Sequence, residues 1–441
     1  MPSPTATLLC IGDELLSGDT VNTNAAYLGR RCRALGVVVH HATVVRDRID
    51  EIVSALQAAA NDANVCLLSG GLGPTTDDLT TEAIAHAAGV ELERDAEALE
   101  RLEAKFRAFG RPMPDANRKQ ADFPHGAEIL ANPIGTAEGF TLALPRSGGG
   151  TCHVFVMPGV PREMKKMMVE QIEPRLRSWL DLQPIPRRIY RVLGMGESAV
   201  AQRIEPVLEQ ARTRSPGLAA MFVHYRAAMP QVQIILEATP SSGGTQATAE
   251  ELASLDEPMQ VALAPGLFGM GNAELAPRLL AALRSAGLRI GTAESCTAGG
   301  IAARLAAIPG ASDCLDGGII AYDNRIKREH LGVTQADLDT HGAVSEIVVR
   351  AMAEGARKAL GSDLCVAVTG IAGPTGATAE KPVGTVHFAI CDADGTEHRQ
   401  LLLRGDRGTV QHATELWALK LVWDRLHARG HASIGEMSTG E

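Results

Sequence analysis

The stretch Gly291-Thr-Ala-Glu-Ser-Cys-Thr-Ala-Gly-Gly300 joins a short apolar run, residues 288–290, to residues 301–307, which have strong helix propensity. A strand, a turn of small residues and a helix in this order present backbone N–H groups to an anion. Ser295 lies in the turn, where its hydroxyl is placed to act as a nucleophile beside an oxyanion site. The alternative is that Ser295 or Thr297 only caps the helix.

Apolar periodicity predicts alternating helices and strands around this stretch, so it belongs to an α/β domain. The expected elements cover residues 275–285, 315–322, 346–360, 364–368, 387–391 and 400–403, with a last helix through residue 426. The segments 387–391 and 400–403 are expected to pair with each other as strands.

The N-terminal part of the chain repeats this alternation. Strands are expected at residues 5–11, 37–39 and 65–68, and helices at residues 24–35, 49–61 and 95–108. Such a pattern indicates a parallel, doubly wound sheet, in which ligands bind beyond the carboxyl ends of the strands. The loops at residues 12–24 and 69–80 both leave strands at that edge.

The loop Gly70-Gly-Leu-Gly-Pro-Thr-Thr-Asp-Asp-Leu-Thr80 combines two kinds of ligand group. Its first three glycines let the backbone approach a phosphate closely. Asp77 and Asp78 offer hard oxygen ligands for a divalent cation. This combination suits a nucleotide or a pyrophosphate, and the alternative is a turn in which an Asp caps the next helix.

A small α+β module is expected between a proline-rich boundary near residue 185 and a second linker at residues 264–272. Its predicted elements are a helix at residues 198–212 and strands at residues 219–224 and 231–238. The sequence Gly194-Met-Gly196 is reminiscent of an RNA-binding KH loop, but it lacks the full GxxG signature and the module is not basic.

Composition narrows the classes of function. The 441 residues exceed a single core and suggest about three domains. The net charge is −10, without a run of Lys or Arg, which argues against a nucleic-acid-binding protein. Eight scattered cysteines form no CxxC pair, so neither a zinc site nor a disulfide framework is indicated. Because no apolar run approaches about 18 residues, we expect a soluble cytoplasmic protein without a membrane partner.

The chain resembles the CinA family in both halves. In the N-terminal part the motifs are Gly12-Asp-Glu-Leu-Leu16 with Asn22-Thr-Asn24, Gly70–Thr80 as quoted above, and Pro158-Gly-Val-Pro-Arg-Glu-Met164. In the C-terminal part they are Ala293-Glu-Ser-Cys-Thr297, Gly342-Ala-Val-Ser345, Thr369-Gly-Ile-Ala-Gly-Pro374 and Lys381-Pro-Val-Gly-Thr385.

This resemblance implies an architecture and two activities. Two α/β domains are expected, a molybdopterin-binding-like domain at residues 1–182 and a PncC-like amidase domain at residues 272–430, joined by a KH-like α+β module at residues 185–264. The C-terminal domain would deamidate nicotinamide mononucleotide (NMN) to nicotinate mononucleotide and ammonia without a cofactor. The N-terminal domain would be an ADP-ribose pyrophosphatase that uses a divalent metal ion (Mg, Mn or Co). The family also implies a homodimer.

The resemblance also implies site residues, with Ser295 as the nucleophile of the amidase. Metal ligands would be Asp77, Asp78 and Glu14. The alternative for Glu14 is a solvent-exposed carboxylate without a ligand. The substrate-binding residues would be Glu294, Cys296, Thr297, Gly370, Gly373 and Arg407 in the C-terminal domain, and Asn24, Gly70, Gly71, Gly73 and Thr75 in the N-terminal domain.

The base for Ser295 is expected to be Lys327. No Ser-His-Asp set is apparent, because His341 has no evident Asp partner. A Ser–Lys pair works when burial lowers the pKa of the lysine, and Tyr322 is placed to relay a proton or orient this pair. Cys296 is the rival nucleophile, but it lacks a neighbouring His to activate its thiol.

Two further segments are expected to contact the substrate. Thr369 and Gly370 follow a strand and are placed to donate hydrogen bonds to the amide or the phosphate. Thr369 is expected to be a catalytic residue. Arg407 is placed to clamp a phosphate with its guanidinium fork. Its alternative partner is Asp406.

One position departs from the family pattern. The family usually has Gly directly after Glu-Ser-Cys-Thr, and this chain has Ala298. A left-handed backbone there would strain an alanine. We expect instead that residue 298 is already helical, where Ala is favoured over Gly.

Two other functions remain open. A molybdopterin-binding protein is suggested by the expected N-terminal fold, and a DNA-uptake or competence-associated binding protein is suggested by the family's name. The fused amidase-like domain counts against the first, and the acidic chain counts against the second.

Overall fold

The computed structural model describes residues 3–239 and 246–435. The chain forms two compact units, one of residues up to 185 and the other of residues 186–238 together with the chain from 247 onward. Neither described range contains a helix that is long and apolar enough to cross a membrane.

The first unit is built on a six-stranded sheet in the order β2-β1-β3-β8-β7-β6. The first four of these strands are parallel, and β7 and β6 are antiparallel additions at one edge. The strands are β1 Thr5–Ile11, β2 Val38–Val45, β3 Val65–Ser69, β6 Glu128–Leu130, β7 Gly139–Pro145 and β8 Thr151–Met157, beside a small pair, β4 Leu92–Arg94 and β5 Asp122–Pro124.

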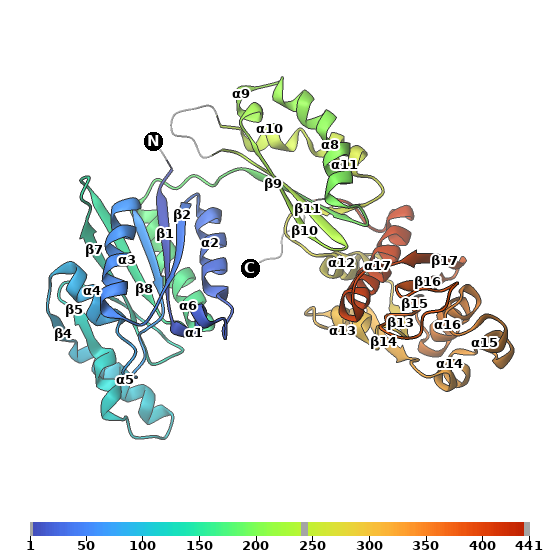
Figure 1. Ribbon diagram of the computed structural model, residues 1–441, viewed down its shortest axis with the longest axis horizontal. Coiled ribbons are helices and arrows are strands. Elements are labelled where there is room, and N and C mark those ends of the chain that lie inside the picture. Colours follow the sequence, from blue (N-terminus) through green and yellow to red (C-terminus); the bar gives the residue numbers. More distant parts are fainter. Residues whose placement is uncertain (1–2, 240–245, 436–441) are drawn as a thin grey trace. The chain divides into compact units, whose positions relative to one another are not determined.

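Helices cover both faces of this sheet, as predicted for a doubly wound fold (Figure 1). On one face α3, α4 and α5 enclose a core with Leu9, Leu68 and Val154, and on the other face α2, α6 and α7 pack on Leu8, Leu67 and Phe155. The helices are α1 Asp13–Ser17, α2 Thr23–Leu35, α3 Ile49–Asp62, α4 Thr80–Ala88, α5 Ala96–Ala108, α6 Pro161–Met167 and α7 Glu173–Trp179.

The amidase-like part of the second unit has a five-stranded sheet in the order β14-β13-β15-β16-β17. Strands β14, β13 and β15 are parallel, and β16 and β17 form the predicted antiparallel pair. The strands are β13 Ile290–Glu294, β14 Leu315–Ile320, β15 Leu364–Gly370, β16 Thr385–Asp392 and β17 Gly395–Leu402.

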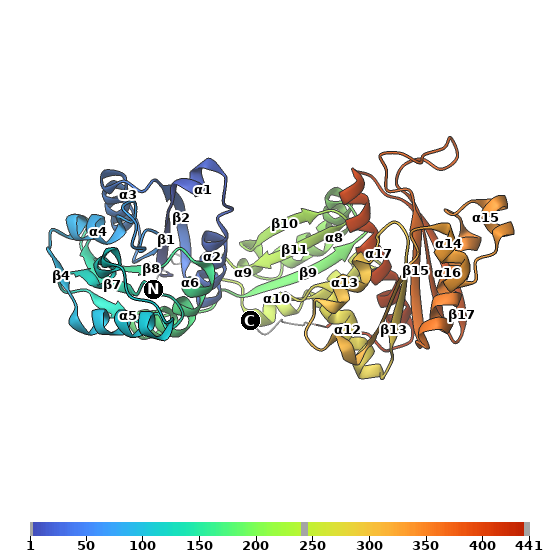
Figure 2. The same ribbon diagram turned by 90° about the horizontal axis from the view of Figure 1, so that it is seen from below.

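Two groups of helices sandwich this sheet (Figure 2). Helices α12, α13 and α17 cover the face that carries Val366, Val368 and Phe388, whereas α14, α15 and α16 cover the face that carries Ala293 and Ala367. The helices are α12 Leu275–Ala286, α13 Gly300–Ala306, α14 Asn324–Leu331, α15 Gln335–His341, α16 Glu346–Leu360 and α17 Arg407–Ala428. The face of the sheet on which a side chain lies decides which groups it contacts at the site.

The rest of the second unit is a four-stranded antiparallel sheet in the order β10-β11-β9-β12 with helices on it. Its elements are β9 Arg187–Leu193, α8 Glu197–Arg212, α9 Pro216–Ala219, β10 Phe222–Ala228, β11 Gln231–Glu237, α10 Ala249–Ala253, α11 Asp256–Leu263 and β12 Leu267–Met270.

Two expectations for this module are corrected by the structure. The strand expected at residues 219–224 starts only at Phe222, as β10, because Ser215 caps a short helix that has Pro216 in its first turn and extends to Ala219. Residues 264–272 are not a linker, because β12 pairs with β9 and is buried. Its Phe268 joins the core of the amidase-like part, so the two parts share packing.

Candidate active sites

Ser295 lies directly after β13, at the carboxyl end of the parallel strands. Its backbone N–H donates to the carbonyl of Val368 at 3.1 Å, which fixes the turn against β15. Side chains alternate along a strand, and Glu294 faces α13, so Ser295 is directed to the face covered by α14 and α16. Its hydroxyl has no hydrogen-bond partner within the described chain, and its residue is 9% exposed.

Glu294, expected to bind substrate, has its carboxylate engaged within the protein, where it holds the turn together. Its buried carboxylate accepts hydrogen bonds from the backbone N–H groups of Gly299, Ile301 and Ala302 at 2.8–3.0 Å, and from the hydroxyls of Thr292 and Thr297. These five donors use its lone pairs, and the charge offsets the positive end of α13. The helix terminus predicted to receive a ligand anion is therefore filled by the chain's own carboxylate.

The capping alternative for Ser295 and Thr297 is also excluded. The N-cap residue of α13 is Gly299, which has no side chain, and N–H groups in the first turn of the helix donate to Glu294. The Thr297 hydroxyl donates to Glu294 instead. Among the described residues, no oxygen accepts from the backbone N–H groups of Cys296 and Thr297. These two donors next to Ser295 are the ones available to an oxyanion.

Ala298 has a left-handed backbone, with φ of 52°, and the helix begins two residues later. The expectation that this residue is helical is therefore wrong. Because Cβ is crowded in the left-handed region, the alanine stores about 1 kcal/mol of strain that a glycine would avoid.

Lys327, near the start of α14, is 1% exposed although it is a lysine. Its Nζ donates to the carbonyl oxygens of Ala321 at 2.7 Å and Tyr322 at 3.1 Å. Burial lowers the pKa of the Lys327 amine below its ordinary value, and Asp323 and Cys296 partly oppose this shift. Helix α14 belongs to the same face of the sheet as the Ser295 side chain. A buried lysine with a lowered pKa is suited to act as a base.

The Cys296 thiol is buried, and burial raises its pKa to about 12. A thiol with this pKa holds almost no thiolate at pH 7, which makes it a poor nucleophile. Its carbonyl oxygen accepts from the side chain of Gln411 at 2.7 Å. Gln411 lies on α17 and was not singled out from the sequence, where nothing marks it among polar helix residues.

Thr369 and Lys381 both hold the loop before α16. The Thr369 hydroxyl donates to the carbonyl of Ala343 at 2.8 Å, and Nζ of Lys381 donates to the carbonyl of His341 at 2.7 Å. Thr369 is 1% exposed. Its hydroxyl proton is thus engaged, and the oxygen retains lone pairs for a donor.

Arg407 joins the two segments on either side of the site. Its guanidinium donates to the carbonyl of Gly373 at 2.9 Å and to the phenol oxygen of Tyr322 at 3.0 Å. The alternative partner Asp406 instead caps α17 through Thr409. Tyr322 is 58% exposed, so its side chain orients Arg407 at the surface and only its carbonyl contacts Lys327.

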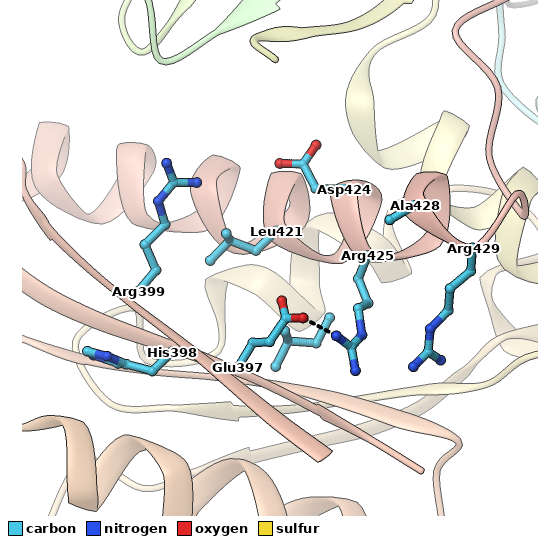
Figure 3. Close-up of a pocket in the computed structure, with 9 residues that line it drawn as sticks. Glu397, His398, Arg399, Leu421, Asp424, Arg425, Ala428 and Arg429 are labelled. Atoms are coloured by element: carbon cyan, nitrogen blue, oxygen red, sulfur yellow. Dashed lines mark hydrogen bonds and ion pairs between the residues drawn. The ribbon is translucent and has the colours of Figure 1, made fainter. Parts of the chain in front are cut away.

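A cavity of about 490 Å³ in the same domain is not this site (Figure 3). It lies between β17 and the last turns of α17, where Arg425 follows Arg407 by 18 residues, about 27 Å along the helix. Two of its three arginines are neutralised within the protein, because Arg425 pairs with Asp392 at 2.8 Å and with Glu397, and Arg429 also pairs with Asp392. These ion pairs fasten the end of α17 to the β16–β17 hairpin. The third arginine, Arg399, lies over the ring of Trp417.

In the first unit, the glycines of the loop after β3 are required by the protein itself. Gly70 and Gly71 have positive φ values of 118° and 68°. A Cβ would collide with the carbonyl of Ile11 at Gly70, with the Thr80 side chain at Gly71 and with the Asp78 carboxylate at Gly73.

Asp78 shapes this loop and does not cap α4. Its carboxylate accepts from the backbone N–H of Thr75 at 2.8 Å and from the Thr75 hydroxyl, so the donors of Thr75 are already used. Leu79, which follows Asp78, is the N-cap residue of α4, and its side chain makes no capping hydrogen bond. Lys119 donates to the carbonyls of Thr75 and Asp78 and supports the loop from outside. One Asp78 oxygen, Oδ1, remains for a ligand.

Carboxylates gather in a cavity of about 440 Å³ at the edge where β1, β2 and β3 end. Glu14, Asp77 and Asp78 line it, together with two residues that sequence reasoning missed, Asp47 and Glu163. The Asp47 carboxylate accepts from the backbone N–H of Asp13 at 3.0 Å. Asp47 follows the end of β2 closely, and this position in the sequence could have marked it as a site residue. The predicted loops therefore do meet at one edge.

The donor chemistry of this cavity suits a hard divalent cation. In the described parts of the chain, however, no three His, Cys, Asp or Glu side chains are already arranged around one point to hold a metal. Burial and the charges of Glu14, Asp13 and Asp77 raise the pKa of Asp47, as expected where carboxylates crowd together without a counterion.

Asn24 lies beside this cavity, at the start of α2. Its amide nitrogen donates to the Ser69 hydroxyl at 2.9 Å and to the carbonyl of Gly159 at 2.8 Å. It thereby ties together the three segments that carry the N-terminal motifs. Its Oδ1 is buried without a partner among the described residues.

The folds and the clustered motifs define a two-domain α/β protein, with a small α+β module that lies between the two domains in the sequence. The family profile described as CinA C-terminal domain matches residues 272–426. The profile described as probable molybdopterin binding domain matches residues 7–178. The chain belongs to the CinA family.

Relatives extend this similarity over nearly the whole chain. A CinA-like protein of Anaeromyxobacter dehalogenans (strain 2CP-C) is 39% identical over 415 residues, covering 94% of this chain and 98% of the relative. A CinA-like protein of Parasynechococcus marenigrum is 40% identical, covering 96% and 97%. Among solved structures, the competence/damage inducible protein CihA of Agrobacterium tumefaciens is 42% identical, with a TM-score of 0.34, covering 35% of this chain and 93% of that one.

Proposed function

We propose that the C-terminal domain hydrolyses the carboxamide of NMN to nicotinate mononucleotide and ammonia. The observations that carry the proposal are the Ser295 hydroxyl, which has no hydrogen-bond partner in the described chain, and the buried amine of Lys327, which has a lowered pKa and interacts electrostatically with the adjacent Cys296. The substrate is the one implied by the resemblance to PncC-like amidohydrolases.

The first half of the reaction forms an acyl-enzyme. Ser295 Oγ attacks the carboxamide carbon, and Lys327 takes the hydroxyl proton. The negative oxygen of the tetrahedral intermediate accepts from the N–H groups of Cys296 and Thr297, whose hydrogens have no other oxygen acceptor in the described chain. Lys327 returns the proton to the carboxamide nitrogen as the C–N bond breaks, and ammonia leaves.

The second half reverses these roles. Water attacks the ester carbon while Lys327 accepts its proton, and the proton then goes to Ser295 as nicotinate mononucleotide leaves. Arg407 holds the substrate phosphate in this scheme, since it lies at the rim and is preoriented by Gly373 and Tyr322. Thr369 and Gly370 complete the wall at the end of β15.

We propose a second activity for the N-terminal domain, the hydrolysis of ADP-ribose to AMP and ribose 5-phosphate. The specific observation in its favour is the cavity that combines the glycine loop with five carboxylates. Asp77, Asp78 and Glu14, with Asp47, would hold a divalent metal ion, which neutralises pyrophosphate charge when bound. Asn24 and Thr75 would keep the loops around the substrate in place.

Incubation with NMN and ADP-ribose, separately and with or without a chelator, tests both activities. Ammonia release that resists the chelator and AMP release that is abolished by it are the expected results. A salt-dependent shift of DNA without either activity would favour the competence-associated binding protein instead. Tight binding of molybdopterin without hydrolysis would favour the molybdopterin alternative.

A further inference from the structure

Three side chains, Glu346, His398 and His387, contact one another in a row at the edge of the amidase sheet. They take no part in the proposed reaction. Nδ1 of His398 lies 3.2 Å from a carboxylate oxygen of Glu346, and its Nε2 lies 2.9 Å from Nδ1 of His387. The imidazole planes are inclined by 20° and the ring centroids are 5.1 Å apart. Because the centroids are so much farther apart than the nitrogens, the two rings meet edge to edge, as an N–H···N bond requires.

The ion pair with Glu346 favours one arrangement of protons along these three side chains. A carboxylate oxygen 3.2 Å away stabilises a proton on Nδ1 of His398 and repels a lone pair there, which leaves the lone pair on Nε2. His387 must then donate its own Nδ1 proton to that lone pair. This leaves Nε2 of His387 as an unprotonated acceptor, and no group in the described chain donates to it. Arg350 donates to Glu346 at 2.7 Å and lowers the pKa of Glu346, which keeps the carboxylate charged.

Strand register places His387 beside the proposed amidase site. His387 is directly opposite Thr369 in the β15–β16 pair, so both side chains lie on the face covered by α16. Ser295 is bonded to the neighbouring Val368. Because Nδ1 of His387 is engaged with His398 on β17, Nε2 is the ring nitrogen left for a ligand on this face of the sheet. His387 is only 7% exposed.

We propose, resting on the amidase function above, that Nε2 of His387 accepts a hydrogen bond from the substrate's carboxamide N–H and selects an amide over a carboxylate. A carboxamide nitrogen carries two hydrogens, whereas the carboxylate of the product carries only acceptor oxygens. The lone pair of His387 therefore attracts the substrate and repels the product, which speeds product release. Glu346 and His398 act through His387 as positioning residues.

The charges around the ring agree with this role. Burial, followed by the influence of His398 and Lys381, lowers the pKa of His387 to about 4, so the ring is neutral at pH 7. Burial also lowers the pKa of His398, with Glu346 opposing the shift and Arg350 adding to it. Protonation of His387 would turn the acceptor into a donor and favour the carboxylate product.

The test uses the full chain and two readouts. In His387→Phe, KM for NMN should rise about tenfold with a smaller change in kcat, and nicotinate mononucleotide should inhibit more strongly. His387→Gln keeps an acceptor oxygen and should recover part of the loss, whereas His398→Phe should resemble His387→Phe. The matched control is Glu354→Met, which removes a similar contact between α16 and β17 at Thr396 and should leave both constants unchanged.

Unchanged KM and product inhibition in folded His387→Phe and His398→Phe, with normal ammonia release by the wild type, would overturn the inference alone. If the wild type releases no ammonia from NMN, the proposed function fails, and the tautomer is then tested directly by nitrogen-15 NMR of labelled histidines at pH 7. The expected spectrum has His387 protonated on Nδ1 and bare on Nε2. A proton on Nε2 would contradict the inference whatever the substrate.

Discussion

Lys327 Nζ lies 2.7 Å from the carbonyl oxygen of Ala321, and this contact positions the amine so that its neutral form can act as a base. A neutral amine has two hydrogens and one lone pair. Two carbonyl oxygens, those of Ala321 and Tyr322, accept from it and use both hydrogens of the neutral form. The lone pair is then left for the proton of Ser295, and burial favours this neutral form.

Replacement of Lys327 by Met should lower kcat for NMN by about a thousandfold with little change in KM, because the base is lost and the volume is kept. In the wild type, kcat/KM should rise with pH as Lys327 loses its proton. The midpoint of this rise should lie below the ordinary lysine value of 10.5, because the pKa is lowered. Lys358→Met, on the exposed side of α16, is the control and should behave as the wild type. A profile without that rise would argue against Lys327 as the base.

Ala298→Gly should stabilise the protein, because glycine adopts the left-handed backbone at φ of 52° without strain. The expected gain is about 1 kcal/mol, or roughly 2–4 °C in Tm for a unit of this size. Ala303→Gly, at an exposed position within α13, is the matched control and should lower Tm, since glycine weakens a helix. Equal shifts in both variants would refute the strain at residue 298.

Local patterns predicted much of the fold but fewer of the contacts at the sites. Helix α16 occupies the predicted residues 346–360, because its apolar spacing and its Ser345 cap are local signals. The short strand β12 was missed because it depends on pairing with the distant β9. The role of Glu294 was missed for a similar reason, since its donors come together only when the turn folds over the carboxylate.

A fragment that starts at residue 272 should be less stable than one that starts at residue 186. The shorter fragment lacks Phe268, which is fully buried in the core shared with the amidase-like part, and it removes the carbonyl of Pro265 that Lys420 contacts at 3.0 Å. Loss of a buried Phe alone costs about 3 kcal/mol, or roughly 6–12 °C in Tm. Thermal unfolding of the two fragments checks this, and equal Tm values would show that the module contributes no stability.

Asp78→Asn should abolish the release of AMP from ADP-ribose and spare deamidation of NMN, because the cavity loses a charged oxygen that would hold the cation. Asn retains an oxygen for the Thr75 hydrogen bonds, so the loop should keep its shape. Asp115→Asn, at a fully exposed carboxylate of the same domain, is the control. Chelator-resistant cleavage of ADP-ribose that persists in Asp78→Asn would contradict the assignment of the metal site.

Ammonia release from NMN by Ser295→Ala and Cys296→Ala, assayed side by side, tests the central claim most directly. The two side chains are neighbours, but burial raises the pKa of the thiol to about 12, whereas the hydroxyl has no hydrogen-bond partner within the described chain and can be activated by a base. The Ser295→Ala variant should lose at least about a thousandfold in rate while still binding NMN, and the Cys296→Ala variant should keep most activity. Normal turnover by the Ser295 variant together with an inactive Cys296 variant would show that the thiol is the nucleophile and that the Ser295–Lys327 mechanism is wrong.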